Sequence, residues 1–96
     1  MNIPKSVKIG GKVYCVEFTR SFNFGSLNVS AEIDYEELAI RIAPNAKDKV
    51  EGDFIHELIH AIADHLGYKN HNEKKIDEFA NALHRVIRDN HELFIN

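Results

Sequence analysis

The sequence predicts a single α+β domain spanning residues 1–96, in which a small antiparallel sheet is followed by two α-helices. Two observations support this prediction. Apolar and polar residues alternate in the first half, as in half-buried strands, whereas apolar residues recur at helical spacing in the second half. A chain of 96 residues with 44% hydrophobic content also has room for only one core.

The first predicted hairpin occupies residues 7–19. Residues 7–9 and 13–18 have strand-like patterns and flank the pair Gly10-Gly11, which accepts the positive φ values of a tight turn. Cys15 lies in the second of these strands. As the single cysteine, it excludes an internal disulfide, and we expect it to be a small buried residue.

A second hairpin is predicted from residues 27–33, which alternate between apolar and polar types, and from residues 38–42, which repeat the pattern. Arg41 is expected to face solvent. The two hairpins, with about four strands in total, would form an antiparallel sheet that has one packed face and one wet face.

The first predicted helix runs from about residue 46 to residue 66. Pro44 ends the sheet, Asn45 is the expected N-cap, and Gly67 is suited to the position just past the C-terminal end. Gly52 inside the helix costs about 1 kcal/mol relative to alanine. We consider a close approach by a neighbouring group as one reason for its presence.

The second predicted helix begins between residues 71 and 73 and runs to about residue 92. Apolar residues at helical spacing, among them Ile76, Phe79 and Leu83, define its packed face. Both helices are expected to cover the same face of the sheet.

Charge and hydropathy exclude several classes of function. The net charge is −3, and lysine and arginine never occur in a run longer than two, so the basic surface needed for nucleic-acid binding is not expected. No apolar run approaches the roughly 20 residues of a membrane span, and no secretory leader opens the chain. The sequence therefore predicts a cytoplasmic protein without a nucleic-acid or membrane partner.

The motif that carries chemistry is His56-Glu57-Leu-Ile-His60, an H-E-x-x-H pattern within the first predicted helix. Histidines four residues apart project from one helix face, so both imidazoles can bind one Zn²⁺. The intervening glutamate can act as general base on water. His56 and His60 are therefore the predicted zinc ligands, with Glu57 as the catalytic base.

A third ligand must come from elsewhere in the chain. Glu73 lies thirteen residues after His60, at the start of the second helix, and Asp77 follows one turn later. We rank Glu73 first as the ligand, with Asp77 as the acceptor for a histidine's second N–H. His71 and Asp64 remain alternatives, in that order.

These residues resemble the gluzincin arrangement of thermolysin-like peptidases, in which a downstream glutamate binds zinc and an aspartate four residues later orients a histidine. Residues 53–83 are more closely similar to the small ImmA/IrrE-type metallopeptidases of phages and mobile elements, in which E-x-E-A-D/N-x-F-A follows H-E-x-x-H. Lys75 departs from that pattern, where the family usually has a second glutamate. The resemblance implies a minimal zincin-like fold with the sheet before the active-site helix.

Other assignments fit less well. The metzincin pattern requires glycine and histidine where this chain has Ala63 and Leu66. His84 would lie about 16 Å along the helix axis from Glu73, so we expect it on the helix surface. Tyr35 and Tyr68 are considered as oxyanion donors, although a core or surface role is the simpler expectation for each.

Two hypotheses of function follow. The first is a zinc-dependent endopeptidase acting on a protein or peptide substrate, which would lie extended along an edge strand. The second is a zinc-stabilised binding or regulatory module of phage or mobile-element origin that cleaves nothing. Glu73 also has a purely structural alternative, because Asn70-x-x-Glu73 reads as a helix capping box.

Overall fold

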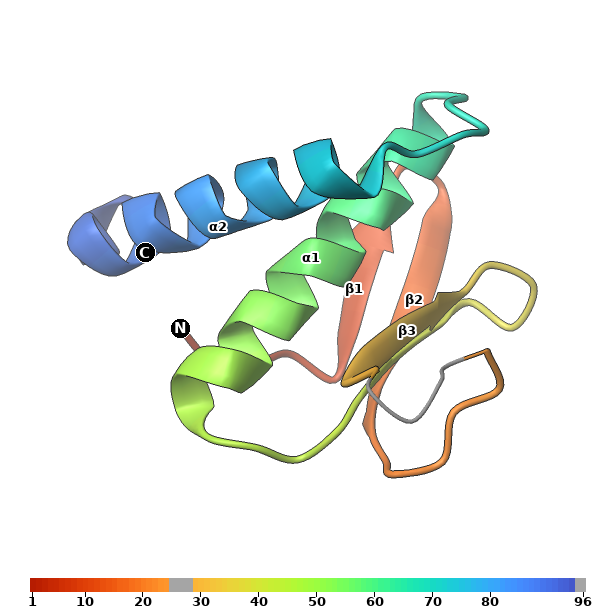
Figure 1. The fold of residues 1–96 in the computed structure, drawn as a ribbon, viewed down its shortest axis with the longest axis horizontal. Coiled ribbons are helices and arrows are strands. Elements are labelled where there is room, and N and C mark those ends of the chain that lie inside the picture. The colour runs from red at the N-terminus through yellow and green to blue at the C-terminus, as the bar shows by residue number, and fades with distance from the viewer. Residues whose placement is uncertain (25–28, 95–96) are drawn as a thin grey trace.

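The computed structural model describes residues 1–24 and 29–94 as a four-stranded sheet, a helix across that sheet, and a second helix on the first (Figure 1). The elements in chain order are β1 (Ser6–Ile9), β2 (Lys12–Phe18), β3 (Ala31–Asp34), β4 (Ala39–Ile42), α1 (Lys47–His65), α2 (Glu73–Asp89) and the short 3-10 helix η1 (His91–Phe94). The predicted α+β class, with the sheet before the helices, is confirmed.

The sheet is mixed, because the two antiparallel hairpins join through a parallel pair. The strand order is β1-β2-β4-β3, and β2 runs parallel to β4. The prediction of an entirely antiparallel sheet was therefore wrong at this junction. The chain leaves β2, reaches the far edge as β3 and returns as β4, and this route makes β4 parallel to β2.

The second hairpin is shorter than predicted. Of the predicted strand 27–33, residues 27 and 28 lie outside the described residues, and β3 begins at Ala31. Leu38 has φ 54° and belongs to the turn, so β4 begins at Ala39. The turn at Asp34 is closed by its side chain, which accepts hydrogen bonds from the N–H groups of Glu36 and Glu37 at 3.1 and 3.0 Å.

The sheet face turned away from α1 is partly covered by charged side chains. Arg41 on this face is only 9% exposed because carboxylates surround it, so the prediction that it faces solvent was wrong. These carboxylates belong to Glu17, Glu32, Asp34 and Glu37. Cys15 is exposed, and its predicted burial was also wrong.

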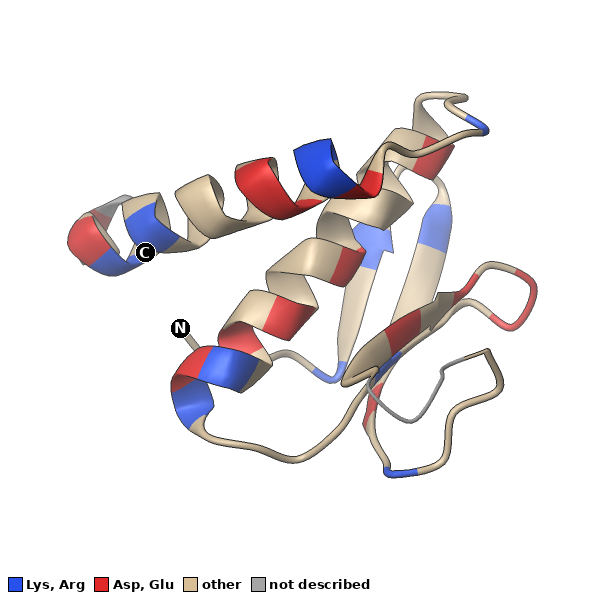
Figure 2. Cartoon of the chain, in the orientation of Figure 1, with Lys and Arg blue, Asp and Glu red and all other residues tan. Residues whose placement is uncertain are grey.

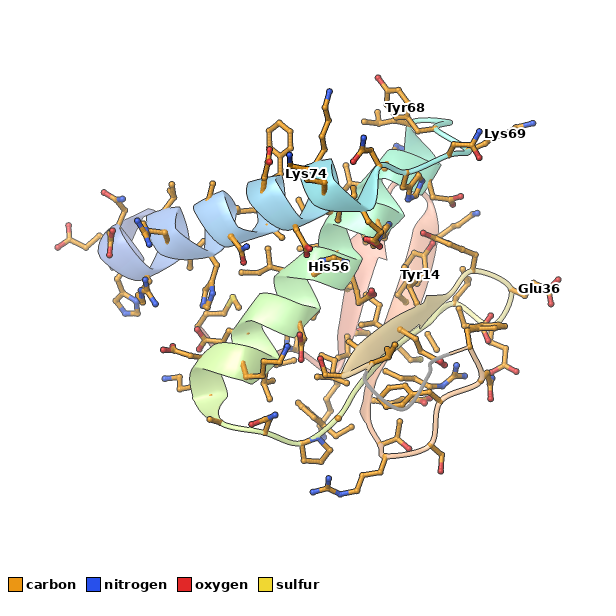
Figure 3. The ribbon with its side chains drawn as sticks, in the orientation of Figure 1. Tyr14, Glu36, His56, Tyr68, Lys69 and Lys74 are labelled. Atoms are coloured by element: carbon orange, nitrogen blue, oxygen red, sulfur yellow. The ribbon has the colours of Figure 1, made fainter. Side chains whose placement is uncertain are left out.

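The hydrophobic core lies between the other sheet face and α1. Ile40 and Ile42 of β4 are fully buried and pack with Tyr14 of β2 and with Phe54 and Ile55 of α1. Figure 3 shows Tyr14 within the layer between β2 and α1. This core places α1 across the sheet beside β3 and β4. The face of α1 that carries the H-E-x-x-H motif is thereby turned toward the remaining elements.

Within the described residues, α2 packs on α1 and makes no contact with the sheet. The expectation that both helices cover the sheet was therefore wrong, and α2 forms a third layer (Figure 1). Ile76 and Ala80 face α1, whereas Phe79 is 68% exposed instead of belonging to the packed face. A narrow stripe suffices for α2 because a single helix is its packing partner.

The helix ends differ in part from the predictions. Asn45 does not cap α1; Ala46 takes the N-cap position without a side-chain hydrogen bond. Gly67 does follow the helix with φ 91°, as predicted, and its N–H donates to the carbonyl of Asp64 at 3.0 Å. The chain therefore turns sharply after α1 and returns along it as α2.

Charged residues are dispersed over the molecule. Across the described ribbon in Figure 2, lysine and arginine segments alternate with acidic ones and form no continuous basic stripe. Neither described helix combines the length and the apolar composition that a membrane span requires.

Candidate metal centre

His56 and His60 project from one face of α1 toward the beginning of α2. Their ring centroids are 4.9 Å apart and their planes meet at 61°. The helix register explains this placement, since residues four apart stand one above the other. The side chain of His60 is more enclosed than that of His56, with 11% and 24% of their areas exposed. Figure 3 shows His56 on the side of α1 that faces α2.

Glu73, the first residue of α2, extends its carboxylate toward both histidines. Oε1 lies 2.7 Å from Nε2 of His60, and Oε2 lies 3.4 Å from Nε2 of His56. The capping-box alternative for this glutamate was wrong. Asn72 is the N-cap and accepts a hydrogen bond from the N–H of Lys75 at 3.1 Å, so the carboxylate of Glu73 is not used to cap the helix.

Asp77, one turn further along α2, reaches the other nitrogen of His56. Its Oδ1 lies 2.8 Å from Nδ1 of His56. A carboxylate accepts hydrogen bonds, so Nδ1 of His56 carries the hydrogen. In the neutral ring, Nε2 of His56 is then an unprotonated nitrogen directed at Glu73.

His71, in the turn between the helices, fixes the tautomer of His60 in the same manner. Nε2 of His71 lies 2.8 Å from the carbonyl oxygen of Tyr68 and must donate to it. Nδ1 of a neutral His71 is then an acceptor, and it lies 2.7 Å from Nδ1 of His60. Opposite a neutral His71, His60 carries its hydrogen on Nδ1 and presents an unprotonated Nε2 to Glu73.

The resulting arrangement fits a divalent metal ion. With the hydrogens on the two Nδ1 atoms, two nitrogen lone pairs face the two oxygens of one carboxylate, an arrangement that a cation between them would stabilise. Ligand atoms about 2.1 Å from a tetrahedral zinc are separated by about 3.4 Å. The distance between His56 Nε2 and Glu73 Oε2, 3.4 Å, equals this separation, whereas that between His60 Nε2 and Glu73 Oε1, 2.7 Å, is the shorter distance of a hydrogen bond.

The protonation states agree with this fit. Burial lowers the pKa of His60 and outweighs the opposing hydrogen bond and charge of Glu73, which favours the neutral ring. Burial alone would raise the pKa of Glu73. The hydrogen bond with His60 and the charges of both histidines outweigh this effect, so the pKa of Glu73 lies below its ordinary value. Neutral imidazoles and an ionised carboxylate are the forms that bind metal.

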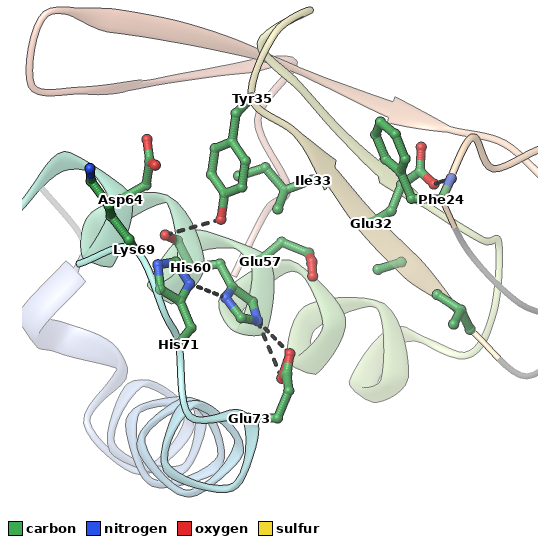
Figure 4. Close-up of a pocket in the computed structure, with 12 residues that line it drawn as sticks. Phe24, Glu32, Ile33, Tyr35, Glu57, His60, Asp64, Lys69, His71 and Glu73 are labelled. Carbon is green, nitrogen blue, oxygen red and sulfur yellow. Dashed lines mark hydrogen bonds and ion pairs between the residues drawn. The ribbon is translucent and has the colours of Figure 1, made fainter. Parts of the chain in front are cut away.

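Glu57 is buried beside these ligands and directed toward β3 (Figure 4). One of its carboxylate oxygens and one ring nitrogen each of His56 and His60 lie within 4.8 Å of one another, so these three side chains could themselves hold a metal ion. One carboxylate oxygen, Oε2, is buried without a hydrogen-bond partner. Burial raises the pKa of Glu57 to about 7; the charge of His56 opposes this shift, and those of Glu73 and Asp53 add to it.

A pocket beside Glu57, lined by described residues, has a volume of about 560 Å³. It opens between α1, the edge strand β3 and the turn that leads into α2 (Figure 4). The pocket is lined by Phe24, Val29, Ala31, Glu32, Ile33, Tyr35, Glu57, His60, Asp64, Lys69, His71 and Glu73. A molecule in this space would touch His60, Glu73 and Glu57 together.

The alternative third ligands occupy different places. His71 contacts His60 from the Nδ1 side, whereas Glu73 faces Nε2. Asp64 lines the pocket, and Lys12 pairs with it at 4.0 Å. The contact between His71 and His60 was not predicted from the sequence. A signal for it was the spacing His71-Asn-Glu73, which places both side chains near the start of α2.

Of the two tyrosines considered as oxyanion donors, Tyr35 lines the pocket. Its hydroxyl donates to the carbonyl oxygen of His60 at 3.4 Å. Burial raises the pKa of Tyr35 well above its ordinary value, assisted by the charges of Asp64 and Glu57, so the hydroxyl remains a donor at neutral pH. Tyr68 is 63% exposed and extends outward near Lys69 (Figure 3).

A second group of possible ligands, formed by Asp48, Glu51 and His84, lies between α1 and the middle of α2. One oxygen of this group, Oε2 of Glu51, is buried without a hydrogen-bond partner. Nε2 of His84 is 3.1 Å from Oε1 of Glu51 and can donate to it, and the amine of Met1 lies 3.6 Å from Oε2. His84 is thus a partly buried partner of Glu51, and its predicted surface position was wrong.

Comparisons of the chain with protein-family models, with curated proteins and with solved structures gave no match.

Proposed function

We propose that this protein is a zinc-dependent peptidase with His56, His60 and Glu73 as metal ligands and Glu57 as general base. One observation carries the proposal. The carboxylate of Glu73 faces the unprotonated Nε2 atoms of both histidines, and the buried Glu57 carries an oxygen without a hydrogen-bond partner beside them. A purely structural zinc site has no use for such an uncoordinated carboxylate.

The reaction would be the hydrolysis of a peptide bond. Zinc, when bound, supplies a Lewis acid and an activated water at the open side of its ligands. Glu57 takes a proton from the water that adds to the carbonyl carbon and passes a proton to the departing amine nitrogen, so that the C–N bond breaks to give a carboxylate and an amine. Asp77 and His71 hold the two ligand histidines in place.

The substrate would be an extended peptide paired with β3. Ser30 accepts a hydrogen bond from the N–H of Ala43 at 2.8 Å, and Glu32 lies opposite Arg41. Since residues of an antiparallel strand alternate in direction, Ala31 and Ile33 direct their N–H and C=O groups toward the free edge. These two residues also line the pocket that contains Glu57.

The proposal also concerns the origin and the cellular location of the protein. The motif and its spacing resemble the ImmA/IrrE-type metallopeptidases, and we propose a cytoplasmic enzyme of phage or mobile-element origin that acts on a protein substrate. The single cysteine is compatible with a reducing compartment.

The test combines metal analysis with peptide cleavage. Protein purified without added metal should contain about one zinc per chain, and zinc should be lost from Glu73→Ala but retained in Glu57→Gln. Only the wild type should cleave a denatured protein substrate, with chelator-sensitive products identified by mass spectrometry. His84→Ala is the matched control and should keep both zinc and activity. Absence of zinc after dialysis against the metal would refute the proposal.

The competing function is a zinc-stabilised binding module. The observation in its favour is the large exposed apolar side chain of Phe79 on α2, since exposed aromatic residues often contact partners. The Glu57→Gln variant separates the two functions. If it retains zinc and reproduces every cellular effect of the wild type, the binding-module function is correct and the peptidase proposal fails.

A further inference from the structure

Phe24 stands at one end of the pocket that contains Glu57. Its side chain is 69% exposed, yet it lines the pocket together with the apolar residues Val29, Ala31 and Ile33 (Figure 4). An exposed phenylalanine leaves a large apolar surface in water, and such a surface beside a cavity is typical of ligand-binding sites.

The backbone that carries Phe24 is held by a buried ion pair. The N–H groups of Asn23 and Phe24 donate to the carboxylate of Glu32 at 3.1 and 2.8 Å. Glu32 is only 5% exposed, and its Oε2 lies 2.8 Å from Nη1 of Arg41. Because Arg41 belongs to the central strand β4, the position of Phe24 is tied to the rigid sheet.

The opposite end of the pocket has a different chemistry. Tyr35, Asp64, Lys69 and His71 supply hydroxyl, carboxylate, ammonium and imidazole groups there. Figure 4 shows Glu57 between this end, where Ile33 also lies beside Tyr35, and the end at Phe24, where the carboxylate of Glu32 accepts backbone hydrogen bonds. A peptide that spans the pocket with its scissile bond at Glu57 would therefore place the residues on either side of that bond in unlike surroundings.

We infer that the site selects peptides with a bulky apolar side chain on the Phe24 side of the scissile bond and a polar residue on the other side. Phe24 is then a specificity-determining residue, and Glu32 is the residue that positions it. This inference rests on the proposed peptidase function, since it assigns the two ends of the pocket to the two sides of the cleaved bond.

Binding is measured first, with the Glu57→Gln protein, so that no cleavage is required. The probes are fluorescein-labelled, capped heptapeptides of alanine and serine with one central phenylalanine, and the same peptides with alanine at that position. Fluorescence anisotropy should give about tenfold tighter binding of the phenylalanine peptide, as expected for burial of one aromatic side chain.

Two further variants assign this preference to Phe24. Phe24→Ala should reduce it to less than about threefold. Phe79→Ala is the matched control, because Phe79 is equally exposed, at 68%, but lies on α2 away from the pocket; it should leave the preference unchanged. Absence of binding, equal binding of both peptides, or a preference that survives Phe24→Ala would overturn the inference.

Cleavage by the zinc-loaded wild type then separates the two proposals. Cuts on one constant side of the phenylalanine, lost in Phe24→Ala, support both. Cleavage without an apolar preference overturns the inference and leaves the peptidase function intact. Binding with a Phe24-dependent preference but without any cleavage refutes the peptidase function, while the apolar end of the pocket remains as a peptide-binding site.

Discussion

The Nδ1 atoms of His60 and His71 lie 2.7 Å apart, and this contact determines which nitrogen of His60 is available to a metal. The carbonyl of Tyr68 requires a hydrogen on Nε2 of His71, so a neutral His71 accepts a hydrogen bond from Nδ1 of His60. Under the proposed function, His71 would thus orient the ligand His60 and set its tautomer without binding the metal itself.

Replacing His71 should therefore weaken zinc binding without removing a ligand. We expect His71→Ala to raise the zinc dissociation constant about 10- to 100-fold, the range seen when hydrogen-bond partners of ligand histidines are lost. Competition with a chromophoric chelator measures the change. His91→Ala, at an exposed position in η1, is the control and should bind zinc as the wild type does. Unchanged affinity in His71→Ala would show that the contact does not orient His60.

Glu57 should make the metal-free protein less stable as the pH rises. Its pKa of about 7 in the folded protein exceeds the ordinary glutamate value, so between these two values the folded state binds more protons than the unfolded state. The stability that protonated Glu57 contributes is fully present below the pKa that this residue has in the unfolded chain. It is lost as the pH rises through about 7, the pKa of Glu57 in the folded protein.

Glu57→Gln removes this penalty and should stabilise the metal-free protein at pH 8 by about 2–3 kcal/mol relative to wild type, with little difference at pH 4. Guanidinium unfolding in the presence of a chelator measures both values. Glu78→Gln on the exposed surface of α2 is the control and should change stability by less than about 0.5 kcal/mol. An equal effect of Glu57→Gln at both pH values would contradict the argument.

Arg41 should be among the most important residues for stability. Its guanidinium lies 2.8 Å from Glu32 and 3.4 Å from Asp34, both of which are buried. Arg41→Met would leave these carboxylates without their cation, at a cost of about 3–5 kcal/mol at pH 7. Chemical denaturation gives the loss. The comparison is Arg88→Met, whose half-exposed pairing with Asp48 at 3.9 Å should contribute about 0–1 kcal/mol.

The same cluster predicts the response to acid. Burial alone would raise the pKa of Glu32, but the N–H of Phe24 and the guanidinium of Arg41 outweigh it, and the pKa lies below its ordinary value. The pKa of Asp34 is also lowered, by hydrogen bonds from the N–H of Glu37 and from Arg41. The stability that these groups contribute is present above their unfolded pKa values and is lost as the pH falls through the folded ones. The destabilisation by Arg41→Met should therefore shrink below about pH 4; a constant difference down to pH 2 would be inconsistent with this origin.

Two glycines should respond to alanine in opposite directions. Gly10 has φ 61°, and a Cβ there would lie 2.3 Å from Cε1 of His65, so Gly10→Ala should destabilise the protein by about 1 kcal/mol or more. At Gly52 a Cβ would meet Nδ1 of His84 at an ordinary 3.7 Å, so no close approach requires this glycine. Gly52→Ala should stabilise α1 by about 0.5–1 kcal/mol. Thermal unfolding of both variants tests the pair, and a stabilising Gly10→Ala would contradict it.

Local patterns predicted most of the elements of this fold. Period-2 and helical repeats identified the hairpins and both helices, and the turn at Gly10 and the stop at Gly67 followed from glycine's access to positive φ. The spacing of the motif also predicted that Glu73 and Asp77 approach His56 and His60, as the distances in the structure show.

Apart from local errors at helix caps and strand ends, the errors concern contacts between segments that are distant in the chain. The parallel pairing of β2 with β4 and the burial of Arg41 depend on the route of the chain between the hairpins. The partnership of His84 with Glu51 depends on how α2 lies across α1. The periodicity of a sequence predicts which face of a strand or helix a side chain occupies, but not which charged group of another element contacts it there.

By itself, therefore, the sequence determined the identity and order of the elements and the side chains that can bind a metal, because helix and strand periods and the spacing of His56, His60 and Glu73 are local properties. The tertiary structure decided which nitrogen of each histidine faces Glu73, and it placed Phe24 at the end of the pocket. Hydrogen bonds to Asp77, His71 and Glu32 fix these features, and such bonds form only when the packed sheet and helices bring distant residues together.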